Sequence, residues 1–533
     1  MIFRNALTFL ILGIVLSVAA PLCAQQPAPA NAKKPVDQVR VVTLLAGGAA
    51  NLSVSLLVKQ RGIDFDLQDD FLQEVRLAGG TDELITALKA AHVTKPSTVD
   101  PAEQARQTEA CRHVATGAGL AKKEQAAEAE KEFRAALQLY PQNADLYTAL
   151  ANVLGQEKKW DDAEAAVEEA LRLDPNNGKA HYNRGVRLRE KGDVDGAIAE
   201  FREALRLNPN DEMAHHNLGD ALGEKGDLDG EIAQFREALR ANPNFGVTHL
   251  NLGIALGRKG DVDGAIAEYR EAVRWDPNLP ETHYNLGLGL ANKGDTDGAI
   301  AEFREALRLN PNADAPYVDL GTALTNKGNL DEAIVQFRAA QRLNPKNGAA
   351  HVGLAEALSR KGDLNGAIAE YREALSLNPQ DEAVHSSLGM ALATKGDAGG
   401  ATAEYREVLR LNPSNDWAHM MLGLALGKQG DLAGAMAEYR EALRVNPNND
   451  AAHDNLGTAL FSKGDVSGAI AEFHEALRLN PNLADAHNNL GVALERKGDW
   501  RAAREEYRAA YSHDPKNAAY KRNYQRLAML REN

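Results

Sequence analysis

Cysteine is almost absent from this chain of 533 residues, which contains only Cys23 and Cys111. Cys23 lies in an N-terminal segment that we expect to be removed, so no internal disulfide can form. The fold must then be stable through packing alone. Cys111 is expected to be a buried, small apolar residue rather than a reactive thiol.

Long apolar runs are also missing after the first residues, so we expect no later segment to cross a membrane. Catalytic motifs are missing as well. There is no glycine loop followed by lysine, no His-Glu-x-x-His, no Gly-x-Ser-x-Gly and no paired cysteines. These absences favour a protein that is not an enzyme and that has no cofactor or metal. The formal charge of −15 argues against binding to nucleic acid and favours a basic partner.

Residues 1–24 have the pattern of a secretory signal peptide. Arg4 precedes an apolar run from Leu7 to Ala20, and small residues lead to a cleavage point after Ala24. We therefore expect export across a bacterial inner membrane, with the mature protein periplasmic or secreted and not inserted in a membrane. The alternative is an uncleaved signal that anchors the chain in the inner membrane, although a spanning helix needs about 20 apolar residues.

The next part of the sequence divides by composition. Residues 25–38 carry prolines among Ala, Gln and Lys, which predicts a flexible spacer. Residues 39–93 have apolar residues at helical spacing, interrupted by glycines, which predicts a small module of about four helices. Residues 94–109 contain further prolines and are expected to form a linker and lead-in.

Proline then recurs every thirty-four residues to the end of the chain. The twelve positions are Pro141, Pro175, Pro209, Pro243, Pro277, Pro311, Pro345, Pro379, Pro413, Pro447, Pro481 and Pro515. Such a period predicts an array of two-helix units that bury their apolar faces against their neighbours. We expect twelve units over residues 110–517, the first of them atypical, and a capping helix over residues 518–533.

Small and apolar residues recur in phase with the prolines. One unit has Gly185, Leu188, Ala197, Phe201, Ala204 and Pro209, and a late unit has Gly457, Leu460, Ala469, Phe473, Ala476 and Pro481. The pattern resembles the tetratricopeptide repeat (TPR), a helix-turn-helix unit of this length. This resemblance implies an all-α fold, a right-handed α-solenoid of about twelve repeats, in which first helices line a concave protein-binding groove.

Ten of the fourteen histidines occupy one position, four residues before the recurrent glycine. They are His113, His181, His215, His249, His283, His351, His385, His419, His453 and His487. Ligands of one metal ion lie within about 2.3 Å of it, whereas equivalent residues of adjacent helices are about 8–10 Å apart. We therefore expect these histidines to pack within the scaffold and not to bind metal.

Asparagine recurs two residues before the glycine, which we call the amide position. It is found at Asn183, Asn217, Asn251, Asn285, Asn455 and Asn489. A row of amides in the groove could hydrogen-bond the main chain of an extended peptide. It resembles the asparagine ladder in the repeat arm of nucleocytoplasmic glycosyltransferases. The alternative is that asparagine is simply a frequent residue of these repeats.

Between the two runs of asparagine, the amide position changes to Asp319, Gly353, Ser387 and Met421. The positions expected near Met421 in the groove hold Trp417, Met420 and Met390. Adaptable methionines beside a large aromatic ring predict a pocket for an apolar side chain of the partner. Drift without function is the alternative.

Together these patterns predict a non-catalytic scaffold or adaptor that binds an extended polypeptide, expected to be basic, in the concave groove. One alternative is a structural organiser of an envelope assembly that acts through its outer surfaces. Another is the binding arm of a separate secretion or glycan-export enzyme complex. The sequence leaves the oligomeric state and the partner's identity open.

Overall fold

The computed structural model describes residues 36–49, 51–65, 67–93 and 100–528. Twenty-nine α-helices and no β-strand are found in these residues, and none of the helices is long and apolar enough to cross a membrane. The chain divides into two units, Met1–Asp276 and Pro277–Asn533. The expected signal peptide and most of the spacer lie outside the described residues.

Four short helices form the module that precedes the repeats. They are α1 (Gln38–Ala46), α2 (Asn51–Arg61), α3 (Asp69–Ala78) and α4 (Asp82–Lys89). Isolated bridges link Val36 to Ile63 and Ile63 to Val93. Helices α1 and α3 pack on the first repeat, and the buried residues of the module join a core that continues to Ala180. The module is therefore part of the first unit's core and not a separate body.

Two expected boundaries need correction. Residues 36–38 are not part of a spacer, because Val36 is buried and its amide donates to the Gly62 carbonyl at 3.0 Å. Residues 101–109, expected to be part of a linker and lead-in, belong to helix α5, which begins at Pro101. The side chain of Asp100 caps this helix and proline fits its first turn, so Asp-Pro is the signal of a helix start.

Cys111 lies in this shared core and is fully buried. Burial, followed by the nearby carboxyl groups of Glu74 and Asp37, raises the pKa of its thiol well above the ordinary value. The thiol therefore stays protonated and unreactive at neutral pH.

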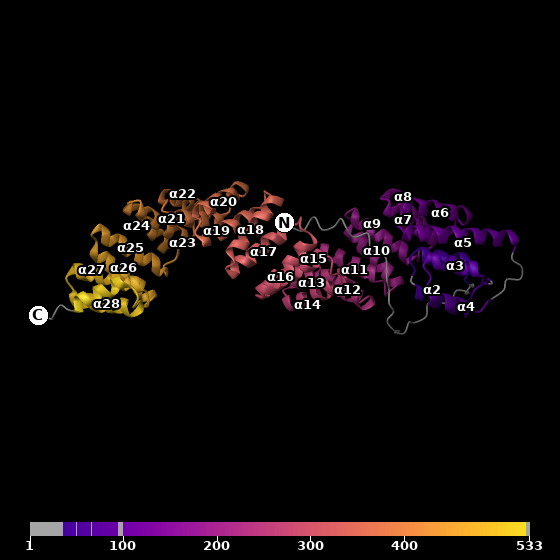
Figure 1. Cartoon of the computed structure of the whole chain (residues 1–533), viewed down its shortest axis with the longest axis horizontal. Coiled ribbons are helices and arrows are strands. Elements are labelled where there is room, and N and C mark those ends of the chain that lie inside the picture. Colours follow the sequence, from indigo (N-terminus) through magenta and orange to yellow (C-terminus); the bar gives the residue numbers. More distant parts are fainter. Residues whose placement is uncertain (1–35, 50, 66, 94–99, 529–533) are drawn as a thin grey trace. The chain divides into compact units, whose positions relative to one another are not determined.

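Antiparallel helix pairs make up the rest of the first unit (Figure 1). Their helices are α5 (Pro101–Lys122), α6 (Ala126–Leu139), α7 (Ala144–Gln156), α8 (Trp160–Leu173), α9 (Gly178–Glu190), α10 (Val194–Leu207), α11 (Glu212–Glu224), α12 (Leu228–Ala241), α13 (Gly246–Lys259) and α14 (Val262–Trp275). Each odd-numbered helix is the first helix of a repeat.

The second unit continues the same pairing. Its helices are α15 (Pro280–Lys293), α16 (Thr296–Leu309), α17 (Asp314–Lys327), α18 (Leu330–Leu343), α19 (Gly348–Lys361), α20 (Leu364–Leu377), α21 (Glu382–Lys395), α22 (Ala398–Leu411), α23 (Asp416–Lys428), α24 (Leu432–Val445), α25 (Asp450–Lys463), α26 (Val466–Leu479), α27 (Ala484–Lys497), α28 (Trp500–His513) and the single helix α29 (Ala518–Ala528). The twelve repeats expected from the prolines are confirmed as twelve helix pairs, α5–α6 to α27–α28.

Close contact between a glycine and an aromatic ring holds the two helices of a repeat together. A Cβ atom at Gly185 would lie 2.7 Å from Cε1 of Phe201, which is fully buried. Ala197, at the same helix crossing, is also fully buried. Small residues let the helix backbones approach, and the ring fills the remaining space.

Glycine and aspartate reverse the chain between the two helices. Gly260 adopts a φ of +88°, a left-handed conformation that glycine accepts without steric cost. The next residue, Asp261, caps helix α14 by accepting a hydrogen bond from the Gly264 amide at 2.9 Å. Proline after the second helix then prevents its continuation.

We expect Gly260→Ala to lower the free energy of unfolding by about 1 kcal/mol, because alanine is strained at positive φ. Gly257→Ala is the matched control, since Gly257 is helical and a Cβ there would meet nothing closer than 3.8 Å. That change should be neutral or stabilising. Urea unfolding followed by circular dichroism measures both, and equal effects would contradict this role of the turn.

Candidate peptide-binding site

All six predicted asparagines lie on first helices and are partly exposed. Asn183, Asn217 and Asn251 belong to the first unit, on α9, α11 and α13. Asn285, Asn455 and Asn489 belong to the second, on α15, α25 and α27. The structure therefore does not define one site that contains all six.

Four of these amides bond to the preceding first helix, three of them through an amide or carboxylate oxygen. Nδ2 of Asn251 donates to Asp220 Oδ1 at 3.1 Å, and Nδ2 of Asn183 donates to Asn152 Oδ1 at 2.7 Å. Nδ2 of Asn489 donates to Asp454 Oδ1 at 3.0 Å. The amide row thus links consecutive repeats, a role that sequence reasoning missed.

The fourth amide is Asn217, and Asn285 is the fifth that already donates a hydrogen bond. Nδ2 of Asn217 donates to the Tyr182 hydroxyl at 3.1 Å and to the Met213 carbonyl at 2.9 Å. Nδ2 of Asn285 donates to the Glu281 carbonyl, one turn back on its own helix, at 2.8 Å. Five of the six expected peptide ligands therefore already donate a hydrogen bond within the protein.

Two of the four exceptions at the amide position follow from packing against the preceding repeat. The Tyr284 hydroxyl donates to Asp319 Oδ2 at 2.8 Å, which matches the pairing of Tyr182 with Asn217. At Gly353, a Cβ atom would lie 2.3 Å from the Phe337 ring. Aspartate and glycine at these positions therefore need no partner protein to explain them.

Met421 is different, because it leaves a buried polar group without a partner. In the preceding repeat, Ser387 at the amide position interacts with Tyr371 and opposes the rise in its pKa that burial causes. Tyr405 is the equivalent tyrosine beside Met421. It is fully buried, and its hydroxyl has no hydrogen-bond partner among the described residues. The Trp417 ring packs edge-on against Tyr405, with centroids 5.9 Å apart.

Burial raises the pKa of Tyr405 to about 12, so the phenol stays neutral. A buried hydroxyl without a partner costs about 1–3 kcal/mol. Within the described residues, no other tyrosine hydroxyl is fully buried without a partner. Packing does not require Met421. It is therefore a better candidate for function than Asp319, Gly353 and Ser387, the other exceptions at the amide position.

Met390 and Met421 are brought together by the repeat geometry. They occupy the positions held by Asp220 and Asn251 in an earlier pair of repeats, where the side chains touch. The Met390 side chain is 44% exposed, which is high for a large apolar residue. We define the methionine patch as Met390 on α21 with Trp417, Met420 and Met421 on α23, the last three being partly exposed.

Asn455 is the one predicted amide that makes no hydrogen bond to the described part of the protein. Asn217 and Asn251 bond to side chains 35 and 31 residues earlier in the chain. The residues 35 and 31 positions before Asn455 are Met420 and Leu424. Neither can take part in an ordinary hydrogen bond with an amide. The free amide therefore lies beside the methionine patch, where its donors and acceptor remain available.

The histidines hold each repeat together through two hydrogen bonds. Nδ1 of His181 lies 2.6 Å from Glu200 Oε2 on the second helix, and Nε2 lies 3.0 Å from the carbonyl of Pro175, which ends the preceding repeat. The same pair of bonds is found at His249, His283, His351, His385, His419, His453 and His487. Each of these rings therefore joins the two helices of its own repeat to the end of the preceding repeat.

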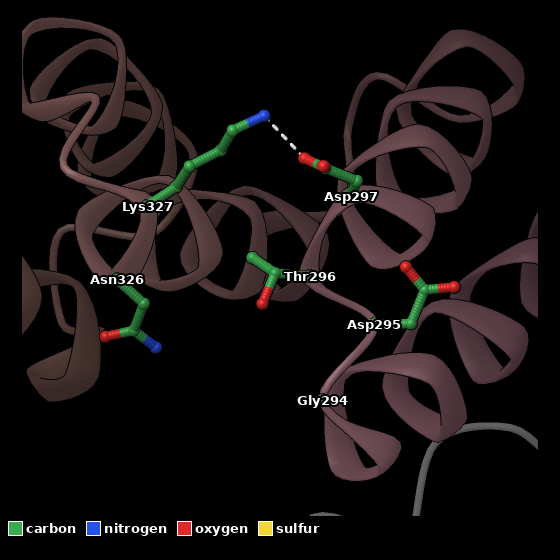
Figure 2. A pocket seen from close by; sticks show the side chains of 6 residues that line it. All are labelled: Gly294, Asp295, Thr296, Asp297, Asn326 and Lys327. Carbon is green, nitrogen blue, oxygen red and sulfur yellow. Dashed lines mark hydrogen bonds and ion pairs between the residues drawn. The ribbon is translucent and has the colours of Figure 1, made fainter.

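The described residues contain no cluster of His, Cys, Asp or Glu that could hold a metal ion. Figure 2 shows a surface recess between α16 and the end of α17. It is lined by Gly294, Asp295, Thr296, Asp297, Asn326 and Lys327. Nζ of Lys327 lies 2.5 Å from Asp297 Oδ1, and the same Lys–Asp pair recurs between other repeats, so the recess belongs to the repeat turn.

Family models agree with this geometry. Tetratricopeptide repeat models match residues 117–178, 148–212, 182–244 and 318–382, and also residues 280–313 and 484–517. A TPR repeat model matches residues 258–294, 423–464 and 457–498. The matches together span more than half of the chain, which belongs to the tetratricopeptide-repeat proteins. Such proteins are generally non-catalytic scaffolds that bind proteins or peptides.

Solved structures give more distant similarities. The chain is 15% identical to a structure of the APC/C hetero-tetramer Cut9–Hcn1, with a TM-score of 0.38, covering 80% of this chain and 99% of that one. It is 24% identical to YrrB, a TPR protein with an unusual peptide-binding site, with a TM-score of 0.30 and coverage of 36% and 97%. It is 26% identical to MamA from residue 41 to the end, from Desulfovibrio magneticus RS-1, with a TM-score of 0.31 and coverage of 32% and 97%. The comparison with curated proteins found no match. The family models, and not these structures, carry the classification.

We expect the histidine bonds to make the stability of the array pH-dependent. The hydrogen bond to Glu506, opposed by burial and helped by the Pro481 carbonyl, raises the pKa of His487 above its ordinary value. This contribution is fully present below the unfolded pKa of about 6.5 and is lost as the pH rises through the raised pKa. The melting temperature should therefore fall as the pH rises above about 6.5 and through the raised pKa.

Glu506→Gln supplies the matched control. It should return the pKa of His487 towards about 6.5 and reduce the pH dependence of the melting temperature. NMR titration of the histidine ring protons measures the pKa directly. A His487 pKa that does not change in the variant would contradict this role of the carboxylate.

Proposed function

We propose that this protein is a non-catalytic scaffold whose first helices in the second unit bind an extended polypeptide. The methionine patch receives an apolar side chain of the partner, and Asn455 hydrogen-bonds the adjacent main chain. Membership of the tetratricopeptide-repeat family supports the general function. The interruption of an otherwise satisfied amide row at Met421 and Asn455 supports this particular location.

The spacing of the repeats suits an extended chain. Adjacent helices pack about 8–10 Å apart, and an extended peptide advances about 3.3 Å per residue, so about three residues of the partner span one repeat. Burial of a large apolar side chain contributes about 1.5–3 kcal/mol, enough to fix the register of the peptide. Main-chain hydrogen bonds would add affinity with little dependence on sequence.

We expect the variants Met421→Asn and Asn455→Ala to weaken partner binding by about ten-fold or more. Asparagine is the commonest residue at the amide position, so Met421→Asn should leave the fold intact. The immobilised full chain would be used to capture proteins from an envelope extract, and each captured protein would then be titrated against the variants.

Asn285→Ala is the control in the same unit, because that amide already donates to its own helix. Binding should be almost unchanged in this variant. Equal losses in Asn285→Ala and Asn455→Ala would instead support the whole amide row as the ligand. Unchanged binding in all three variants would favour the alternatives, an organiser that acts through outer surfaces or the binding arm of a secretion or glycan-export complex.

We also propose that the protein is exported and acts in the periplasm or outside the cell. The support is the sequence pattern of residues 1–24, with Arg4 before the apolar run and small residues before the cleavage point. We expect the mature protein to begin at Gln25, as measured by N-terminal sequencing of the protein from a periplasmic or secreted fraction. Recovery of chains that begin at Met1 in the inner-membrane fraction would instead establish an uncleaved anchor.

A further inference from the structure

Three carboxylates follow the methionine patch along the second unit without a cation. Asp450 Oδ2 accepts a hydrogen bond from Asn480 at 2.7 Å, and Asp454 accepts one from Asn489 at 3.0 Å. Asp485 accepts one from the Tyr520 hydroxyl. Each carboxylate is therefore held in place by a neutral donor, and its negative charge remains uncompensated.

Asparagines also bond Asp314, Glu382 and Asp416 of the second unit, as Asn480 bonds Asp450. Carboxylates at the repeat turns are paired with cations instead. Asp297 and Asp331, at repeat turns, form ion pairs with Lys327 and Lys361. By contrast, no ion pair with Lys, Arg or His involves Asp450, Asp454 or Asp485 within the described residues. Negative potential therefore persists on this side of the patch.

The pKa of Asp454 shows that its ionised carboxylate is destabilised by burial and by the neighbouring carboxylates. Burial first, and then the nearby charges of Asp485 and Asp450, raise the pKa of its carboxyl to about 6, although the Asn489 hydrogen bond opposes the shift. A cation placed here would relieve the repulsion and favour the ionised carboxylate. The carboxylates are partly or fully exposed, so a ligand can reach them.

The buried hydroxyl of Tyr405 is independent evidence that the adjacent patch receives a ligand. Its counterpart Tyr371 interacts with Ser387, the residue at the amide position of the next repeat, and this interaction opposes the rise in the Tyr371 pKa that burial causes. At Tyr405 that position is Met421. On the opposite side of the patch, helix α19 carries both Glu356 and Arg360, so that side has no preference for one sign of charge.

We propose that the partner segment is bipartite, with a large apolar residue for the methionine patch and a lysine or arginine for the carboxylates of Asp454 and Asp485. This inference rests on the proposed function and specifies its ligand. Asp454 lies on α25, one repeat beyond α23, so the apolar and the basic residue should be about three positions apart in an extended peptide. Asp485 lies on α27, one repeat further, and a long basic side chain one or two positions later can reach it from there.

A random-peptide library displayed on phage and selected on the full chain tests this directly. Enriched peptides should carry an apolar residue and a basic residue about three to five positions apart. Synthetic peptides would then be titrated by fluorescence anisotropy. Replacing the basic residue with norleucine should weaken binding about ten-fold, and raising the salt concentration should weaken only the basic peptide.

The protein variant Asp454→Asn/Asp485→Asn should lower affinity for the basic peptide and leave the norleucine peptide unaffected. Asn can keep the hydrogen bonds of both positions, so folding should be retained. Asp297→Asn/Asp331→Asn is the matched control, since it removes the same charge from the same unit at turns. It should have little effect on either peptide.

The possible results distinguish a failure of the bipartite ligand from a failure of the proposed scaffold function. Apolar peptides that need Met421 but show no basic residue would overturn the bipartite ligand and retain the proposed function. Peptides that bind Met421→Asn as well as the original protein would overturn both. Failure to enrich any peptide would also count against the proposed function.

Discussion

The packing of an aromatic ring against a glycine, found in ten of the twelve repeats, is the contact on which the rest of the structure depends. At Gly185 the Phe201 ring occupies space that any larger side chain would need, so the two helices can take up only one separation. Repetition of this contact places the first helices in equivalent positions, repeat after repeat. Every other interaction described above uses that regular placement.

Regular placement makes polar side chains on neighbouring repeats partners of one another. His181 joins two helices of its own repeat to the end of the preceding one, and Asn251 joins consecutive first helices. A polar residue that recurs with the period is therefore first of all a structural bond. The same reasoning makes Met421 informative, because it replaces such a bond and leaves the Tyr405 hydroxyl without a partner.

The fold was predictable in most of its detail, because the proline, glycine and aromatic positions repeat often enough to define both helices of every repeat. The start of helix α5 at Pro101 was missed, since proline is compatible both with a linker and with a first helical turn. The order of Val36 was missed as well, because its bridge to Ile63 joins residues distant in sequence. Neither signal is periodic, so the repeat could not reveal it.

By itself, the sequence determined the repeat, its two helices, the turns and the family, since each depends on local conformation and on a pattern repeated many times. Only the tertiary structure decided which of the recurrent side chains already make hydrogen bonds within the protein. Asn251 and Asn455 hold the same position in their repeats, each directly before Leu-Gly. One donates to Asp220, whereas the other has Met420 and Leu424 at the equivalent positions of the repeat before it. The difference arises from the neighbouring repeat, and contacts between repeats exist only once the helices have packed.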